Sequence, residues 1–230
     1  MLNFLISNII KVVVKYWPLF LQGLGFTLLL SVITVFFGAI IGLFVASMKM
    51  SKLSIYKIRP FSIIASLYIE IIRGTPLLLQ LYFFYFLLPM LVPAMELSKF
   101  TCIAIALLFN SSGYVAEIIR AGIEAVDKGQ TEAARSLGLN GKQTMIKVVI
   151  PQAIKNILPA LCNEFIMVIK ETSLASTFFV GDLMTQYKVI SGALYLVIEP
   201  LIVIGFIYMA LTYSLSKGVA VIERGLKVSE

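Results

Sequence analysis

The sequence contains no histidine, and cysteine occurs only twice in its 230 residues, as Cys102 and Cys162. The lack of histidine excludes a histidine proton relay, a histidine haem ligand and a histidine-based catalytic triad. Both cysteines lie in apolar stretches without the paired spacing of a metal site, so we expect them to be small buried residues. The residue types present therefore predict no metal and no cofactor.

Two catalytic motifs are also missing. The GxxxxGK[ST] pattern that cradles nucleotide phosphates does not occur, and neither does the GxSxG pattern of a serine nucleophile. This chain is therefore not expected to be an enzyme, and any ATP-driven process would need a separate ATP-hydrolysing subunit.

Charged residues are scarce, at 13% of the chain, whereas hydrophobic residues make up 60%. Soluble domains are typically about half apolar and a quarter charged, so this excess of apolar surface calls for a lipid bilayer as solvent. The formal net charge of +7 would suggest nucleic acid as a partner of a soluble chain. In a membrane chain it is better interpreted as topology, with membrane lipid and no nucleic acid as partners.

Apolar stretches long enough to cross a bilayer predict an all-α membrane protein of about five transmembrane helices. The first carries Gly38 and Gly42 four residues apart, a spacing that lets another helix approach closely. Pro76 is expected to kink the second, which Pro89 and Pro93 should end. The five predicted spans cover residues 23–48, 60–88, 100–119, 156–180 and 195–219.

One long polar segment, residues 120–155, separates the third and fourth predicted spans. Its pattern is helical, with expected breaks at residues 137–141 and at Pro151. Thr131 is a plausible helix N-cap, and Glu132 would then lie near the positive end of the helix dipole.

The basic residues predict the orientation, because Lys and Arg concentrate on the cytoplasmic side of a membrane. Thirteen of the nineteen lie in the loop after the first span, in segment 120–155 and in the C-terminal tail, and four lie on the opposite side. This places the N-terminus outside, the C-terminus and segment 120–155 in the cytoplasm, and the protein in the cell membrane as a multi-pass chain. The thirteen are Lys49, Lys52, Lys57, Arg59, Arg120, Lys128, Arg135, Lys142, Lys147, Lys155, Lys217, Arg224 and Lys227.

The cytoplasmic segment contains a spaced motif. Glu132, Ala133 and Ala134 are followed after three residues by Gly138, and after nine more by Val148-Val149-Ile150-Pro151. This resembles the EAA motif of permease subunits of binding-protein-dependent ATP-binding-cassette importers, with conservative changes at Val148 and Ile150. The resemblance implies the type I importer permease fold with a cytoplasmic coupling helix, which docks on the ATPase. The residues it assigns to coupling are Glu132, Ala133, Ala134, Arg135, Gly138 and Pro151.

Two further stretches resemble the polar amino-acid subgroup of that family, whose members carry histidine, glutamine, arginine or cystine. Residues 70–80 look like its "RGTPLLVQ" segment. Residues 163–174, which contain Asn163-Glu164-Phe165 and Lys170-Glu171, are similar to its "NEF…K-D/E-T/S-S-L" segment. Glu171 stands where many relatives have aspartate. The resemblance predicts a permease domain at residues 23–221, after an N-terminal extracytoplasmic or interfacial segment at 1–22 and before a cytoplasmic tail at 222–230.

Ionisable residues inside a membrane cost about 2.5–3.5 kcal/mol on insertion scales, so they should have partners or line a wet cavity. Glu164 and Glu171 lie seven residues apart and would share one helix face. The resemblance implies that Glu171 holds the α-amino group of the cargo and that Glu164 lies near its side chain, which would favour a basic amino acid. The hydroxyl and amide groups of the Asn110-Ser111-Ser112 cluster could bind the carboxylate. The candidate substrate-binding residues are Glu164, Glu171, Asn110, Ser111, Ser112, Arg73 and Thr75.

Structural interpretations stay open beside these. Glu70 with Arg73, and Lys170 with Glu171, could form structural ion pairs. At the level of function, the sequence favours an ATP-driven importer subunit for a polar amino acid. The alternatives are an ion-coupled secondary amino-acid transporter, for which no convincing internal repeat is present, and a membrane enzyme or assembly factor. The resemblance implies three partners: a cytoplasmic ATPase dimer, an extracytoplasmic amino-acid-binding protein, and a second permease copy, identical or related.

Overall fold

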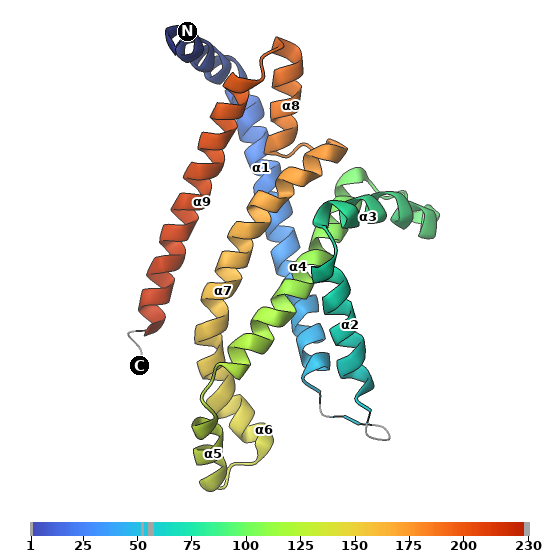
Figure 1. Cartoon of the computed structure of the whole chain (residues 1–230), viewed down its shortest axis with the longest axis vertical. Coiled ribbons are helices and arrows are strands. Elements are labelled where there is room, and N and C mark those ends of the chain that lie inside the picture. The colour runs from blue at the N-terminus through green and yellow to red at the C-terminus, as the bar shows by residue number, and fades with distance from the viewer. Residues whose placement is uncertain (1, 52, 55–57, 228–230) are drawn as a thin grey trace. The chain divides into compact units, whose positions relative to one another are not determined.

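The computed structural model describes residues 2–51, 53–54 and 58–227, and these residues form helices joined by short connections (Figure 1). Lys52 and Lys57, two of the basic residues behind the predicted orientation, lie outside the described residues, as do residues 1 and 228–230 of the predicted terminal segments. The elements are α1 (Leu2–Lys49), α2 (Pro60–Gly74), α3 (Leu77–Leu91), η1 (Pro93–Met95), α4 (Lys99–Glu124), α5 (Lys128–Ser136), α6 (Gly141–Thr144), η2 (Met145–Val149), α7 (Ile150–Glu171), η3 (Thr172–Phe178), α8 (Leu183–Leu194) and α9 (Ile198–Lys227).

Four described helical stretches are long and apolar enough to cross a membrane, and α2 with α3 provide a fifth if the two count as one span. The four cover Asn3–Lys49, Lys99–Glu124, Gly141–Phe178 and Ile198–Leu226. The predicted all-α membrane architecture of about five spans is therefore confirmed.

The chain divides into two compact units, each with a core of its own. Unit 1 comprises Met1–Thr34, Leu77–Leu107 and Phe165–Ser216, and unit 2 comprises Val35–Pro76, Leu108–Glu164 and Lys217–Glu230. Helices α1, α4, α7 and α9 contribute residues to both units.

Unit 1 is held by two apolar clusters. One packs α1, α3, α4 and η3 around Leu30, Leu81, Leu107 and Phe178. The other packs the N-terminal part of α1 on α8 and α9 around Val12, Phe20, Leu183, Ile190, Val203 and Ile204. In both, close side-chain packing joins helices that are far apart in sequence.

Helix α8 has no counterpart among the predicted spans, because its twelve residues are too few to cross a bilayer. Its N-cap is Asp182, which is fully buried and accepts hydrogen bonds from the backbone N–H of Met184 at 2.9 Å and from Thr185. Burial raises the pKa of the Asp182 carboxyl, while these hydrogen bonds act in the opposite direction. The Thr27 hydroxyl on α1 accepts a further hydrogen bond, of 3.0 Å, from the Leu183 N–H.

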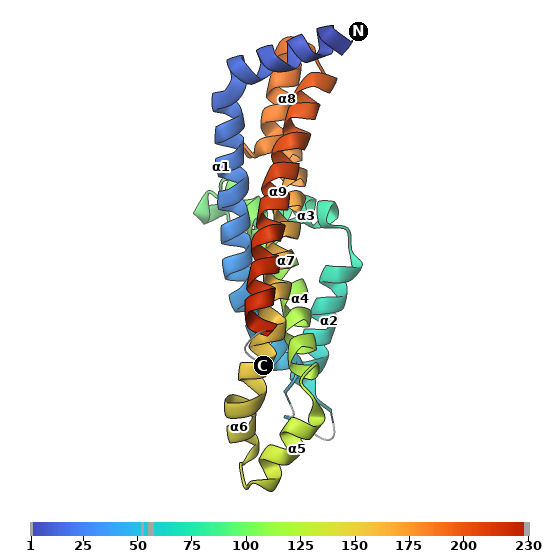
Figure 2. The ribbon, with the colours of Figure 1, turned by 90° about the vertical axis from the view of Figure 1, so that its left-hand side faces the viewer.

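The N-terminal segment is helical and continuous with the first span. Figure 2 shows the first turns of α1 running across the direction of the turns that follow. Pro18 lies inside this helix, and an internal proline removes a backbone hydrogen bond and kinks the helix axis. Asn8 donates a 3.1 Å hydrogen bond to Glu199 at the beginning of α9, which fixes the N-terminal segment to α9 within unit 1.

Unit 2 packs the C-terminal half of α1 against α2, α4 and α7, around Val45, Ala46, Ala65, Ile69, Val115, Ala116 and Ile119. Gly38 and Gly42 face α4 in this packing. A Cβ on Gly42 would lie 2.7 Å from a methyl carbon of Val115, and one on Gly38 would lie 3.3 Å from the Cβ of Ser111. The close helix approach predicted from the spacing of these glycines is confirmed.

The second predicted span breaks where Pro76 was expected to kink it. Helix α2 ends at Gly74, Thr75 adopts an extended conformation, and α3 begins at Leu77. The residue before a proline disfavours the helical region for steric reasons, which accounts for Thr75. The prediction that Pro89 ends this span was wrong, since α3 continues through Pro89 to Leu91.

Segment 120–155 folds into α5, α6 and the π-helical turn η2, all within unit 2. The predicted break near Gly138 is confirmed. Thr131 is not the N-cap of α5, because Asp127 lies four residues earlier and its carboxylate accepts a 2.6 Å hydrogen bond from the Gly129 N–H. Nor does Pro151 break the helix: η2 leads directly into α7, and the helical stretch Gly141–Phe178 runs through Pro151.

Candidate functional site

A polar cluster lies inside α4, in the part of that helix that belongs to unit 2. Asn110, Ser111 and Ser112 are 3%, 1% and 0% exposed, although such residues usually lie at the surface of a protein. Buried polar groups of this kind require hydrogen-bond partners, and the partners distinguish the two serines.

Ser111 contacts the predicted carboxylate. Its hydroxyl donates a 3.0 Å hydrogen bond to Glu164 on α7. Glu164 is half-buried. The structure therefore brings together two of the predicted substrate-binding residues from helices that are far apart in sequence.

Ser112 is engaged differently. Its hydroxyl lies 2.5 Å from the Tyr68 hydroxyl of α2 and donates to the Phe109 carbonyl at 2.7 Å. Tyr68 also donates a 3.0 Å hydrogen bond to the Phe109 carbonyl. These contacts join α2 to α4, so Ser112 contributes to helix packing.

Glu171 ends α7 and belongs to unit 1, where it is half-buried. The next residue, Thr172, is fully buried and donates a 2.7 Å hydrogen bond to the Ile169 carbonyl. The described residues show no Lys170–Glu171 salt bridge within 4.0 Å. The two charged groups therefore make no direct contact, although the Lys170 charge still acts on Glu171 electrostatically.

Arg73 does not pair with Glu70 within the described residues. Its guanidinium lies 3.6 Å from Glu117 on α4 and 5.5 Å from the centre of the Tyr114 ring. Thr75 donates a 2.8 Å hydrogen bond to the Ile71 carbonyl one turn earlier. Arg73 and Thr75 are thus both engaged within unit 2.

Glu117 is a residue that sequence reasoning missed. Besides Arg73, it contacts Lys49 at 2.6 Å and Arg120 at 2.9 Å, and Arg120 also contacts Glu124 at 2.5 Å. A signal was available, because Glu117, Arg120 and Glu124 follow the helical spacing that places them on one face. We call the five residues Lys49, Arg73, Glu117, Arg120 and Glu124 the Glu117 cluster.

All of the predicted coupling residues except Pro151 lie in α5 and the turn that ends it. We call this exposed segment, residues 128–138, the knob. Glu132, Ala133, Arg135 and Gly138 are exposed, whereas Ala134 is buried. Glu132 and Arg135 have no ion-pair partner among the described residues. The free charges are therefore available to another chain.

Gly138 shapes the end of this knob. Its φ of 86° lies in the left-handed region, which glycine adopts at little cost. The Gly138 N–H donates to the Arg135 carbonyl at 3.0 Å, and the Leu139 N–H donates to the Ala134 carbonyl at 3.2 Å. This is a Schellman motif with glycine at its left-handed position.

The chain then reverses into α6. Asn140 and Gln143 form a reciprocal capping box at its beginning, with hydrogen bonds of 2.9 Å. A hollow between α5 and η2 is lined by Thr131, Arg135, Gly141, Thr144, Met145 and Val149. Capped at both ends, α5 is positioned by local hydrogen bonds.

Residues 38–228 match the family described as binding-protein-dependent transport system inner membrane component. The chain belongs to this family. The predicted identification as an importer permease is therefore confirmed, and the chain is an inner-membrane component of a transport system. The membership leaves the ion-coupled transporter and the membrane enzyme or assembly factor without support.

Several curated relatives are similar over nearly the whole length of this permease. It is 41% identical to an arginine transport system permease protein of Bacillus subtilis (strain 168), over 93% of this chain and 94% of that protein. It is also 41% identical to a glutamine transport system permease protein of Rickettsia bellii, named as putative, over 94% and 98%. The L-cystine transport system permease protein of Bacillus subtilis is 37% identical over 92% and 88%.

Solved structures support the fold. A crystal structure of an amino acid ABC transporter with histidines matches with a TM-score of 0.86 and 49% identity, over 93% of this chain and 97% of that chain. An inward-facing methionine ABC transporter matches with a TM-score of 0.75 and 19% identity, over 92% and 98%. The predicted importer permease fold is therefore confirmed.

Proposed function

We propose that this permease carries a polar amino acid across the cell membrane, driven by a cytoplasmic ATPase dimer and supplied by an extracytoplasmic binding protein. The observation that carries the proposal is the exposed knob of α5, with Gly138 in its Schellman motif. The named functions of the relatives, which transport arginine, glutamine and cystine, support a polar amino acid as cargo.

The knob supplies the features that docking on an ATPase needs. Ala133 presents no bulk beyond a methyl group, so a partner backbone can approach closely. Glu132 and Arg135 offer one charge of each sign, without partners among the described residues, and such charges favour one orientation of a docked surface. Gly138 ends the helix sharply, and Pro151 lies where the segment rejoins α7.

We propose that carboxylates and polar side chains of this permease bind the charged groups of the transported amino acid. Glu164, held by Ser111, and Glu171 are the acceptors we propose for the ammonium groups of an amino acid. Asn110, Ser111 and Ser112 supply amide and hydroxyl groups on α4, and we propose that they bind the cargo carboxylate. Arg73 and Thr75 complete the proposed set. Two carboxylates favour a basic amino acid over a neutral one.

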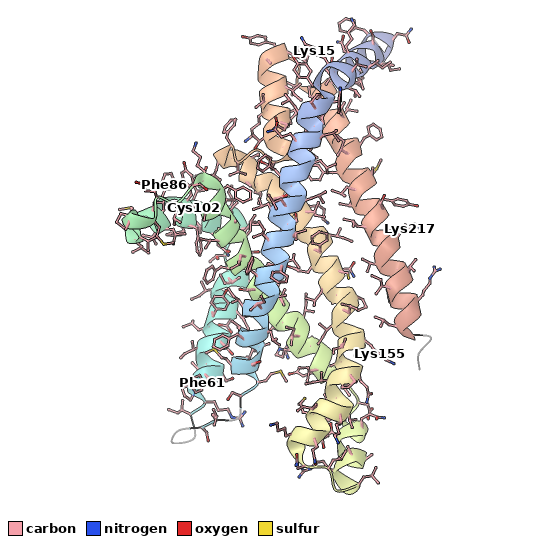
Figure 3. The ribbon with its side chains drawn as sticks, turned by 180° about the vertical axis from the view of Figure 1, so that it is seen from behind. Lys15, Phe61, Phe86, Cys102, Lys155 and Lys217 are labelled. Atoms are coloured by element: carbon pink, nitrogen blue, oxygen red, sulfur yellow. The ribbon has the colours of Figure 1, made fainter. Side chains whose placement is uncertain are left out.

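The orientation follows from the basic residues. We propose that segment 120–155 and the C-terminus lie in the cytoplasm and that the N-terminus lies outside. Figure 3 marks Lys155, the last residue of that segment, on α7. The N-terminal part of α1, with Trp17 exposed, suits the outer headgroup region.

A second permease copy, identical or related, completes the proposed pathway, because about five spans enclose too little space for an alternating-access route. Closure of the ATPase dimer on ATP would displace the two knobs, and the spans would then exchange outward for inward access. This chain supplies the pathway, while the hydrolysis of ATP belongs to the partner.

The test is reconstitution. The permease is purified with its ATPase, placed in proteoliposomes with the binding protein, and offered radiolabelled L-arginine, L-glutamine and L-cystine in turn. We expect ATP-dependent uptake of at least one of them. Uptake by the permease alone under an ion gradient, or failure of the ATPase to co-purify, would contradict the proposal.

A further inference from the structure

The Glu117 cluster contains more positive than negative charge around a single central carboxylate. Lys49, Arg73 and Arg120 all contact Glu117, whose side chain is only 17% exposed. Glu124, at 59% exposed, contacts only Arg120 within the cluster. Three cations around one largely buried carboxylate mark Glu117 as the group that holds them together.

The three cations come from three helices that share the core of unit 2. Lys49 is the last residue of α1, Arg73 lies in the last turn of α2, and Arg120 lies one turn beyond Glu117 on α4 itself. The apolar contacts among these helices, such as those of Val45, Ile69 and Val115, are not directional. The ion pairs instead hold the ends of α1 and α2 at one fixed position along α4.

Glu117 lies close to the knob along the chain, so the ion pairs that hold α1 and α2 on α4 lie near the place where the knob is attached. Helix α4 ends at Glu124, and the N-cap of α5 is Asp127 (Figure 1). Only about two helical turns separate Glu117 from the end of α4. A displacement of the knob therefore reaches Glu117 through the short connection at residues 125–127 and the last turns of α4.

We propose that Glu117 is a positioning residue that transmits motion of the α5 knob from α4 to α1 and α2. The inference rests on the proposed function, since coupling to an ATPase is part of that proposal. In this mechanism of transmission, Arg73 acts mainly as an attachment point for Glu117, because its guanidinium faces Glu117 and the Tyr114 ring. Loss of the Glu117 carboxylate would weaken this transmission, leaving α2 joined to α4 by the Tyr68 hydrogen bonds and α1 joined to α4 by apolar packing.

The primary test compares Glu117→Gln with the wild type in the reconstituted complex of permease, ATPase and binding protein. Uptake of radiolabelled L-arginine, or of L-glutamine if arginine is not transported, is measured with phosphate release in the same vesicles. We expect the number of amino acids imported per ATP to fall at least about fivefold, the lower end of typical coupling effects between sites. Basal ATP hydrolysis should stay within about twofold, because the change does not touch α5.

Matched variants separate transmission from folding. Glu117→Asp keeps the carboxylate and is expected to restore much of the import per ATP. Glu70→Gln removes an exposed carboxylate one turn before Arg73 that forms no salt bridge among the described residues, and it should leave the ratio unchanged. If Glu117→Gln fails to assemble, Lys49→Gln decides the question, because it leaves two cations on Glu117 and should still lower the ratio.

A double-mutant cycle tests whether Lys49 affects import through its contact with Glu117. If Lys49 acts through Glu117, then Lys49→Gln lowers import per ATP in the wild type and adds nothing to Glu117→Gln. An unchanged ratio in both single variants, with normal wild-type transport, overturns the inference and leaves the proposed function standing. A wild-type complex without ATP-dependent uptake contradicts the proposed function itself.

Discussion

The Ser111 hydroxyl donates a 3.0 Å hydrogen bond to the Glu164 carboxylate, which joins α4 to α7 within unit 2. The pair places a carboxylate beside a buried polar cluster in a helix of membrane-spanning length. An ammonium group is the natural complement of such a carboxylate, and an incoming cargo amine would add a charge-assisted bond to it.

Replacing Glu164 by Gln should therefore weaken the uptake of a basic amino acid. We expect KM for L-arginine to rise about tenfold, since a hydrogen bond to a charged group contributes about 1.5 kcal/mol or more. Ser111→Ala should have a smaller effect in the same direction, because the carboxylate remains. Uptake kinetics in proteoliposomes measure both, and an equal loss for arginine and glutamine would contradict a contact with the cargo side chain.

Glu171 and Lys170 offer a direct comparison between cargo binding and structure. We expect Glu171→Gln to weaken uptake strongly without abolishing basal ATP turnover, because it removes the acceptor that we propose for the α-amino group. Lys170→Gln changes the exposed neighbour and should have little effect. Equal losses in the two variants, measured by uptake with phosphate release, would indicate a structural ion pair instead.

Gly138 is expected to be critical for coupling. Its φ of 86° costs other L-residues about 1–2 kcal/mol, and Gly138→Arg also adds bulk at the exposed end of the knob. Transport should be lost while membrane insertion and basal ATP hydrolysis persist. Gly138→Asn is the matched control, since asparagine tolerates the left-handed region. Normal transport by the arginine variant would refute the coupling role.

Gly42 should limit how closely α1 and α4 pack. A Cβ there would lie 2.7 Å from a methyl carbon of Val115, and overpacking of this kind costs about 1–3 kcal/mol. Gly42→Ala should thus lower the melting temperature of the detergent-solubilised complex. Gly25→Ala, on the same helix with nothing within 4 Å of the added carbon, should leave it unchanged or slightly higher.

Local patterns predicted some helix boundaries well and others poorly. The break at Gly138 followed from residues close in sequence, whereas the N-cap was placed on Thr131 when Asp127 provides it. A threonine and an aspartate are both acceptable caps, and their choice depends on how the chain leaves α4. Helix α8 was missed because its stability comes from the buried Asp182 cap and from packing on α1 and α9.

The candidate site shows the same limit. The carboxylates Glu164 and Glu171 were identifiable from their cost inside a membrane. The partners were not, because Ser111 and Glu164 are 53 residues apart and Lys49 and Glu117 are 68 apart. Arg73 was considered with Glu70, its neighbour on the same helix, whereas its partner lies on α4.

The sequence by itself determined that the chain lies in a membrane and has about five spans, and residues 132–151 resemble the coupling motif of importer permeases. The first two properties depend on composition and on the length of apolar stretches, to which each residue contributes independently. Only the tertiary structure decided which polar side chains meet. Pairing across α1, α2, α4 and α7 depends on how closely the helices pack, and the side chains at the contacts, glycines among them, set that distance.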